Sequence, residues 1–179
     1  MAQAGWLLGW IGALAAAAPA LAAPLPPPPP PLPPPLPSGG GSSRGQTGGP
    51  DPVAEVLVDL SEQRLSAFDS HHRLLYRRPV STGVAASPTP TGSFTVAARY
   101  AATPMTGRDY HIPSVSHVLC LAGDGLAPDA ICIHPAPWQE AAGEAFGVRR
   151  SHGCVRTSSA TARWLFERTP VGTPVIIQP

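Results

Sequence analysis

Two segments in the second half of the chain combine cysteine and histidine side chains, which together can form a nucleophile and its base. Residues 151–156 read Ser-His-Gly-Cys-Val-Arg, and the apolar run Ile-Cys-Ile-His occupies residues 131–134. A thiol is a weak nucleophile until it loses its proton, and a neighbouring imidazole can accept that proton. The pattern therefore predicts covalent chemistry at Cys154 with a histidine as its base.

Two histidines are candidates for that base. His152 lies two positions from Cys154 and would share a face with it in an extended segment, whereas His134 arrives from a separate strand, as a base positioned by the fold would. Adjacency in the sequence decides only weakly between them. Gly153 allows a tight backbone turn, so the amides of Gly153 and Cys154 are candidates for holding an oxyanion.

The surrounding sequence predicts a mainly β domain that positions these groups. Short runs of alternating or continuous apolar residues, separated by Gly and Pro turns, predict strands. One helix is predicted from Ser159 to Arg168, with Ser158 as its N-cap and Pro170 and Gly172 beyond its end. The helix therefore follows the cysteine-containing run directly. The predicted strands occupy residues 56–60, 64–68, 74–81, 93–98, 116–121, 130–134 and 174–177.

The composition limits the functions that the chain can have. It has 179 residues, 25 of them proline, and a net charge of +1 with twelve Arg, no Lys and eleven Asp and Glu. Eleven of the prolines fall in residues 24–37, and the 128 residues after position 51 are enough for one domain with a core. The balanced charge argues against a nucleic-acid partner, and the missing lysine excludes Schiff-base and Ser/Lys mechanisms.

The N-terminal part reads as targeting and spacer sequence. Residues 1–23 contain an uncharged apolar stretch followed by an Ala-x-Ala site, which predicts a signal peptide. An uncleaved membrane anchor is the alternative, because residues 6–25 carry no charge and are long enough to span a bilayer. Residues 24–51, rich in Pro, Gly and Ser, are predicted to be a linker, and residues 52–179 to be the folded domain. We therefore expect export to the periplasm or cell envelope.

Residues 151–156, with His134 separated from Ser151 by sixteen residues, resemble the signature of the L,D-transpeptidases of the YkuD type. That signature is an upstream histidine followed by [Ser/Thr]-His-Gly-Cys-x-[Asn/Arg]. The resemblance is not confined to the motif and extends over nearly all of residues 53–179. The further segments that resemble the family are residues 56–65, 79–83, 89–94 and 171–175.

This resemblance implies a mainly β fold, a β-sandwich of mixed sheets with one helix following the catalytic cysteine, and an enzyme that acts on bacterial peptidoglycan. Cys154 would attack a donor tetrapeptide stem, release its terminal D-alanine and form a thioester. An amine of a second stem would resolve the thioester as a 3→3 cross-link. Hydrolysis of the thioester, giving a carboxypeptidase or endopeptidase, is the alternative. The chemistry implies no cofactor and leaves the oligomeric state open.

The resemblance also implies a role for each residue of the site. His134 would exchange the proton with Cys154, and Arg156 and Tyr110 would contact the substrate. Pro135 stands where relatives often carry a smaller residue, and its missing backbone N–H leaves the local support of the histidine open. The remaining motif residues would shape the site and hold the oxyanion: Ser151, His152 and Gly153.

Two other cysteines, Cys120 and Cys132, lie on predicted strands joined by a loop. We expect them to be small buried apolar residues, with a disulfide as the alternative in an oxidising compartment. A zinc site formed by His134, His152 and Cys154, with Cys132 as an optional further ligand, is another alternative for the cluster. The spacing of these residues does not match paired-ligand motifs, so no metal is expected.

Overall fold

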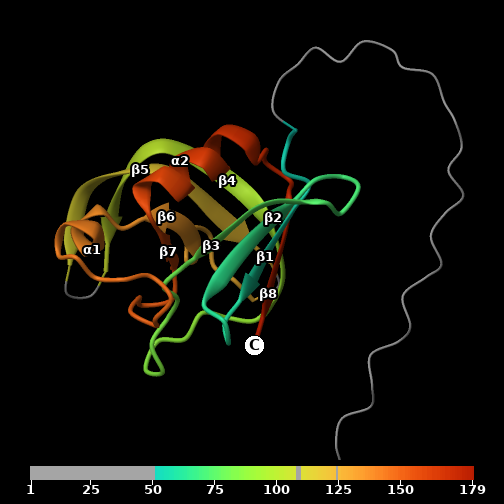
Figure 1. Ribbon diagram of the computed structural model, residues 1–179. Helices are drawn as coiled ribbons and strands as arrows, with labels where there is room; N and C mark the ends of the chain where they lie inside the picture. Colours follow the sequence, from blue (N-terminus) through green and yellow to red (C-terminus); the bar gives the residue numbers. More distant parts are fainter. Residues whose placement is uncertain (1–50, 108–109, 124) are drawn as a thin grey trace, which may run out of the picture. The chain divides into compact units, whose positions relative to one another are not determined.

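The computed structural model describes residues 51–107, 110–123 and 125–179 (Figure 1). The predicted signal peptide or anchor, and all of the predicted linker except residue 51, lie outside these residues. Within the described part of the chain, no helix is long and apolar enough to cross a membrane.

Within the described residues, eight strands form one hydrogen-bonded sheet in the order β3-β2-β1-β8-β4-β5-β6-β7. The sheet is mixed, because β1 pairs with β8 and β6 with β7 in parallel, while the other neighbours are antiparallel. The predicted mainly β, mixed fold with a helix after the cysteine is confirmed, and α1 is an addition to the predicted elements. The elements are β1 Glu55–Asp59, β2 Arg64–Phe68, β3 Leu74–Pro79, β4 Gly92–Thr106, β5 His111–Ala122, β6 Cys132–Pro135, α1 Pro137–Ala141, β7 Val155–Thr157, α2 Ser159–Arg168 and β8 Pro174–Gln178.

The β4–β5 hairpin is much longer than the sequence predicts. Both strands extend well beyond residues 93–98 and 116–121, which carry the apolar pattern. The additional residues of β4 alternate between exposed and half-buried positions, so they have no core-facing apolar pattern to detect. Pro104 interrupts the pattern as well, and a register shift between Thr103 and Met105 accommodates it. This extension provides one wall of the site described below.

The main hydrophobic core lies on one face of the sheet. Ile133 of β6, Val155 of β7 and Leu165 of α2 belong to it. Helix α2 begins where the sequence predicts, because the side chain of Ser158 accepts a hydrogen bond from the Thr161 N–H. Side chains alternate between the two faces of a strand, so the neighbours of Ile133 and Val155 point away from this core. The candidate site forms on that opposite face.

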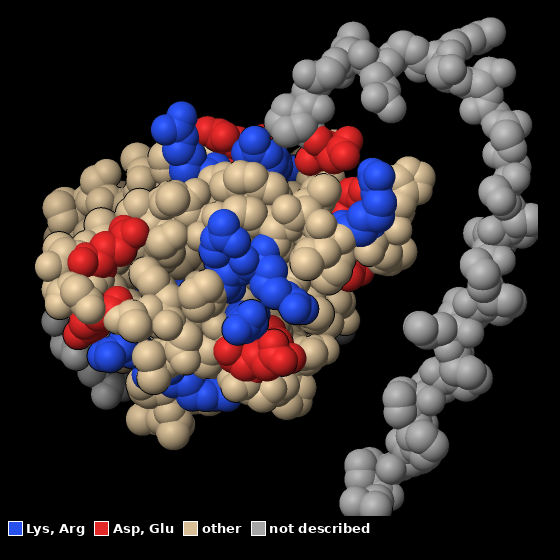
Figure 2. Space-filling model, viewed as in Figure 1, with Lys and Arg blue, Asp and Glu red and all other residues tan. Residues whose placement is uncertain are grey.

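Arginine side chains lie beside acidic ones on the face shown in Figure 2. Among the described residues, Arg163 pairs with Glu167 at 2.8 Å and Arg150 with Glu144 at 3.5 Å. This mixture agrees with the balanced charge of the sequence. Near the centre of the same face several blue side chains lie together, with acidic ones directly below them (Figure 2).

Cys120 and Cys132 form a disulfide, so the expectation of two unpaired buried cysteines was wrong. The two residues are direct partners across the antiparallel strands β5 and β6, with their Cα atoms 4.0 Å apart. The sequence could not show this pairing, because the loop between the strands leaves their register open. Cys154 is the cysteine that remains free.

Thiol labelling tests this assignment directly. We expect one labelled cysteine in the denatured, non-reduced chain and three after reduction, counted by intact mass. A disulfide that closes a loop of this length, with a sequence separation of 12, stabilises by about 3 kcal/mol. The double substitution Cys120→Ala and Cys132→Ala should lower the free energy of unfolding in urea by a similar amount. Three labelled cysteines without reduction would exclude the disulfide.

Candidate active site

Strands β6 and β7 bring the two predicted catalytic segments together. They pair in parallel, with His134 opposite Arg156 and Ile133 opposite Val155. Since Ile133 and Val155 face the main core, His134 and Arg156 face the other side of the sheet. Cys154 lies two positions before Arg156 and is on that side as well. Two motifs that are separated in the sequence therefore meet because adjacent strands carry them.

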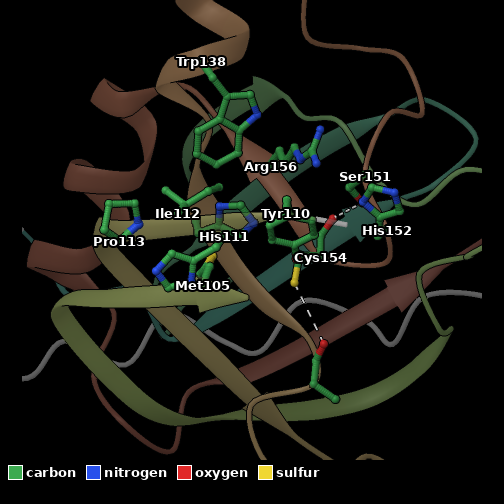
Figure 3. A pocket seen from close by; sticks show the side chains of 12 residues that line it. Met105, Tyr110, His111, Ile112, Pro113, Trp138, Ser151, His152, Cys154 and Arg156 are labelled. Carbon is green, nitrogen blue, oxygen red and sulfur yellow. Dashed lines mark hydrogen bonds between the residues drawn. The ribbon is translucent and has the colours of Figure 1, made fainter. Parts of the chain in front are cut away.

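A cavity of about 510 Å³ opens on this side of the sheet, and Cys154 lies in its wall (Figure 3). Of the seven predicted site residues, all but Gly153 line the cavity. Further wall residues come from the β4–β5 hairpin, from the segment before β6 and from α1. The complete lining is Met105, Tyr110, His111, Ile112, Pro113, Ala130, His134, Trp138, Ser151, His152, Cys154 and Arg156.

His134 is a buried and oriented imidazole, only 4% exposed. Its Nδ1 atom lies 2.8 Å from the carbonyl oxygen of Pro135. A carbonyl oxygen can only accept, so Nδ1 carries the ring proton and Nε2 is left as the acceptor. Burial lowers the pKa of His134 to about 4, reinforced by the charge of Arg156 and opposed by the Pro135 carbonyl. At pH 7 the side chain is therefore a neutral base.

Pro135 supports this histidine despite its missing N–H. The contact uses the carbonyl oxygen of Pro135 and needs no backbone donor from it. Pro135 is also the last residue of β6, where it pairs with Thr157 of β7. The departure from the family pattern at this position is thus compatible with an oriented His134.

The sulfur of Cys154 contacts two main-chain groups. It accepts a hydrogen bond from the Cys132 N–H at 3.4 Å, and it lies 3.9 Å from the carbonyl oxygen of Ala130, to which the thiol can donate (Figure 3). Burial raises the pKa of the Cys154 thiol, while the Cys132 N–H and the charge of Arg156 oppose that rise. Cys154 is therefore a thiol in the resting state. It shares the cavity with a neutral imidazole, so the pair carries no net charge before substrate binds.

Ser151 closes the loop that presents the cysteine. Its hydroxyl donates to the Cys154 carbonyl oxygen at 2.5 Å and accepts from the Gly153 N–H at 3.1 Å. Gly153 has φ 125°, in the region that favours glycine, and a Cβ at this position would lie 3.1 Å from Ile131. The Gly153 N–H, predicted as an oxyanion donor, is thus engaged by Ser151 in this structure. Of the two predicted oxyanion donors, the Gly153 and Cys154 amides, this leaves the N–H of Cys154.

His152 forms a wall of the cavity together with Tyr110. The two rings stack with centroids 5.7 Å apart and an angle of 22° between their planes. His152 is exposed, whereas the ring of His134 is buried and has a fixed tautomer. The geometry therefore favours His134 over His152 as the base for Cys154.

Trp138 of α1 is a site residue that sequence reasoning missed. Its ring lies 5.6 Å from the guanidinium of Arg156 and 6.1 Å from the ring of His134, measured between centres. Arg156 also donates to the Arg150 carbonyl at 3.1 Å, so the cation is held in the wall from two sides. The available signal was a tryptophan four positions after the histidine, in a stretch dominated by small residues.

Substitution of Arg156 tests the electrostatics of the site. Arg156→Gln removes a cation that favours the thiolate, so the pKa of Cys154 should rise and the rate of its alkylation by iodoacetamide at pH 7 should fall. The measurement is the alkylation rate as a function of pH. Arg163→Gln, which removes an exposed arginine paired with Glu167 on α2, is the matched control and should leave the profile unchanged. If the pH midpoint of alkylation in Arg156→Gln were equal to or lower than that of the original chain, the role assigned to Arg156 would be contradicted.

The zinc alternative has no support in this geometry. Cys132 is held in the disulfide and is not a thiolate ligand. Across residues 51–107, 110–123 and 125–179, no three His, Cys, Asp or Glu side chains are placed to share a metal ion.

The chain matches known proteins over the region that contains this site. A family model described as the L,D-transpeptidase catalytic domain, YkuD, matches residues 54–177. The chain is 32% identical to Probable L,D-transpeptidase 3 of Mycobacterium tuberculosis over 122 residues, which cover 60% of this chain and 42% of that protein. It is 31% identical to L,D-transpeptidase 1 of the same organism over 129 residues, covering 69% of this chain and 51% of that protein. The chain thus spans about half the length of these relatives.

Solved structures show the same architecture. The crystal structure of L,D-transpeptidase 3 from Mycobacterium tuberculosis has a TM-score of 0.57 and 26% identity, covering 72% of this chain and 62% of that one. An L,D-transpeptidase from Mycobacterium smegmatis has a TM-score of 0.59 and 25% identity, covering 70% of this chain and 58% of that one.

Proposed function

Because the chain belongs to the YkuD family of L,D-transpeptidase catalytic domains, we propose that it transfers acyl groups between peptidoglycan stem peptides through a thioester on Cys154. The observation that carries this proposal is one cavity whose wall contains both a free thiol and a buried, neutral imidazole with a fixed tautomer. A thiol and an imidazole in this arrangement are the parts that acyl transfer requires.

In the proposed acylation step, Cys154 and His134 act together. As the sulfur attacks the carbonyl carbon of the donor stem, the thiol proton passes to Nε2 of His134, and the Cys154 N–H stabilises the developing oxyanion. The imidazolium then gives the proton to the nitrogen of the departing D-alanine, the C–N bond breaks and the thioester remains. An imidazolium with a pKa of about 4 is a strong proton donor, so this return to the leaving nitrogen is favourable.

The rest of the cavity wall suits a peptide that carries carboxylates. Arg156 supplies a half-buried positive charge, and Trp138 and Tyr110 supply apolar and aromatic surface. A desolvated arginine binds a carboxylate more strongly than an exposed one does. We therefore assign the donor stem to this cavity, with a carboxylate on Arg156. The bond-making and proton-transfer steps of acylation use the thiol, the imidazole and a main-chain donor, so they call on no cofactor.

The N-terminal residues extend the proposal to export of the chain and to its access to the cell wall. Residues 1–23 act as a signal peptide, or residues 6–25 as an anchor, and residues 24–51 act as the spacer that lets the domain reach the wall from the membrane side. A solved relative, L,D-transpeptidase 3 of Mycobacterium tuberculosis, is in complex with a faropenem-derived adduct. Faropenem is therefore a second probe of acylation for this chain.

Product analysis tests the proposal and separates it from hydrolysis. The full-length chain is incubated with a tetrapeptide stem, with and without a second stem whose side-chain amine is free. Transfer gives a product with the mass of two stems minus one D-alanine, only when the amine is present. Hydrolysis gives a tripeptide and D-alanine in both arms. Absence of D-alanine release in both arms would overturn the proposal.

A further inference from the structure

A second cavity, of about 330 Å³, also has Cys154 in its wall. It lies between strand β4 and the segment that leads into β6, and it includes Tyr100, Asp129 and both cysteines of the disulfide. The residues common to the two cavities are Met105, Tyr110, Ala130 and Cys154. Cys154 therefore borders both of these neighbouring cavities.

The two spaces carry opposite charges. Arg156 lines the first cavity, and Asp129 is the charged side chain among the described residues that line the second. Asp129 directly precedes Ala130, whose carbonyl oxygen lies 3.9 Å from the Cys154 sulfur. The carboxylate therefore belongs to the segment that contacts the nucleophile.

Tyr100 holds the Asp129 carboxylate in place. Its hydroxyl donates to Oδ2 of Asp129 at 3.0 Å, from strand β4 across the cavity to the segment before β6. The hydrogen bond and the negative charge of Asp129 raise the pKa of Tyr100 above its ordinary value, so the phenol remains the donor. One carboxylate oxygen is bonded to Tyr100, and the carboxylate keeps acceptor capacity for a second donor.

We propose that Asp129, oriented by Tyr100, binds the ammonium group of the acceptor substrate in this second cavity. This inference rests on the proposed function and names the substrate group that the second cavity takes. Donor and acceptor must reach one thioester from different directions, and their reacting ends differ in charge. The donor's departing D-alanine carries a carboxylate, whereas the acceptor brings an amine that is protonated in water at pH 7. Arg156 therefore favours the donor in the first cavity, and Asp129 favours the acceptor in the second.

The transfer step is balanced with Asp129 in this role. The ammonium group gives one proton to the carboxylate and becomes a neutral amine. Its nitrogen forms the bond to the acyl carbon, the C–S bond breaks, and the sulfur takes the second proton that the nitrogen sheds. The carboxylic acid then returns its proton to solvent, so the products are the amide and the resting thiol.

The test separates acylation from acceptor use in the full-length chain. Acyl-enzyme is formed with a tetrapeptide stem, and its decay is followed by intact mass at increasing concentrations of a cationic acceptor stem. Asp129→Asn should weaken the acceptor-dependent rate by about tenfold or more, because a charge-assisted hydrogen bond is lost. Asp129 has φ 56°, a conformation that asparagine also adopts readily, so the variant retains the backbone. Tyr100→Phe should have a smaller effect in the same direction.

Two controls isolate the ammonium site. Hydroxylamine, a nucleophile that is neutral at pH 7, should remove the acyl group from Asp129→Asn and from the original chain at equal rates. Glu62→Gln removes one exposed carboxylate outside the second cavity and should leave all rates unchanged. Equal acceptor-dependent rates in Asp129→Asn and the original chain, with normal acylation in both, would overturn this inference alone. Absence of acyl-enzyme in the original chain would overturn the proposed function, and this inference with it.

Discussion

Cys154→Ala should form no covalent adduct with a tetrapeptide stem, and its rate of D-alanine release should fall at least about 10⁴-fold, to the background. The reason is that Cys154 is the free cysteine, while the other two are joined and cannot replace it. The side chain is only partly buried, and its substitution removes a single atom, so the fold should persist. Release of D-alanine, measured by mass spectrometry, and thermal unfolding of the variant give the two readouts.

Cys154→Ser is the matched companion to that variant. A hydroxyl retains the size and hydrogen-bonding capacity of the site but ionises far less readily than a thiol. We expect Cys154→Ser to lose most of the acylation rate while it binds the stem with unchanged affinity in calorimetry. Turnover by either variant at more than a few per cent of the original rate would place the nucleophile elsewhere.

His134→Gln should reduce the acylation rate by about 10²- to 10⁴-fold, the range for loss of a positioned general base. Its effect has a diagnostic pH dependence. In the original chain the imidazole is neutral above its pKa of about 4, so the rate should be flat near neutrality and fall as the pH drops through 4. In the variant no base takes the thiol proton, so the rate should rise with pH as the thiolate forms, about tenfold per pH unit.

Burial of His134 also makes the free energy of unfolding depend on pH. The pKa is about 6.5 in the unfolded chain and about 4 in the folded one, so the neutral form is favoured by folding. The contribution of His134 to the free energy of unfolding is therefore fully present above pH 6.5 and decreases as the pH falls toward 4. Rates at low pH must be divided by the folded fraction, measured by circular dichroism. A His134→Gln profile that stays flat and parallel to the original would contradict the assignment of the base.

Helix α2 and the candidate residues His134 and Cys154, which line one cavity, carry local sequence signals. His134 ends an apolar run, Cys154 follows Gly153 in a compact motif, and α2 has an N-cap at Ser158. The fold class followed from the short alternating runs and from the family resemblance. What connects the two motifs, the parallel pairing of β6 and β7, depends on a strand of only three residues that no periodicity could reveal.

Other parts of the site depend on register and on tertiary contacts, which the sequence does not encode locally. The disulfide required Cys120 and Cys132 to be opposite one another in β5 and β6. The sequence predicts the Gly153 N–H as an oxyanion donor because it does not show that this N–H donates to the Ser151 side chain in the folded chain. Trp138 reaches the cavity through α1, a five-residue helix without a strong sequence signal. The second cavity likewise appears only when β4 and the segment before β6 lie together.

The central claim is that the sulfur of Cys154 becomes acylated by a wall peptide. The measurement is the mass of the full-length chain after incubation with a tetrapeptide stem and quenching in acid, followed by peptide mapping. We predict a gain equal to the stem minus one D-alanine, located on the peptide that contains Cys154 and removed by hydroxylamine. An unmodified chain that nevertheless releases D-alanine, or an adduct on any other residue, would contradict it.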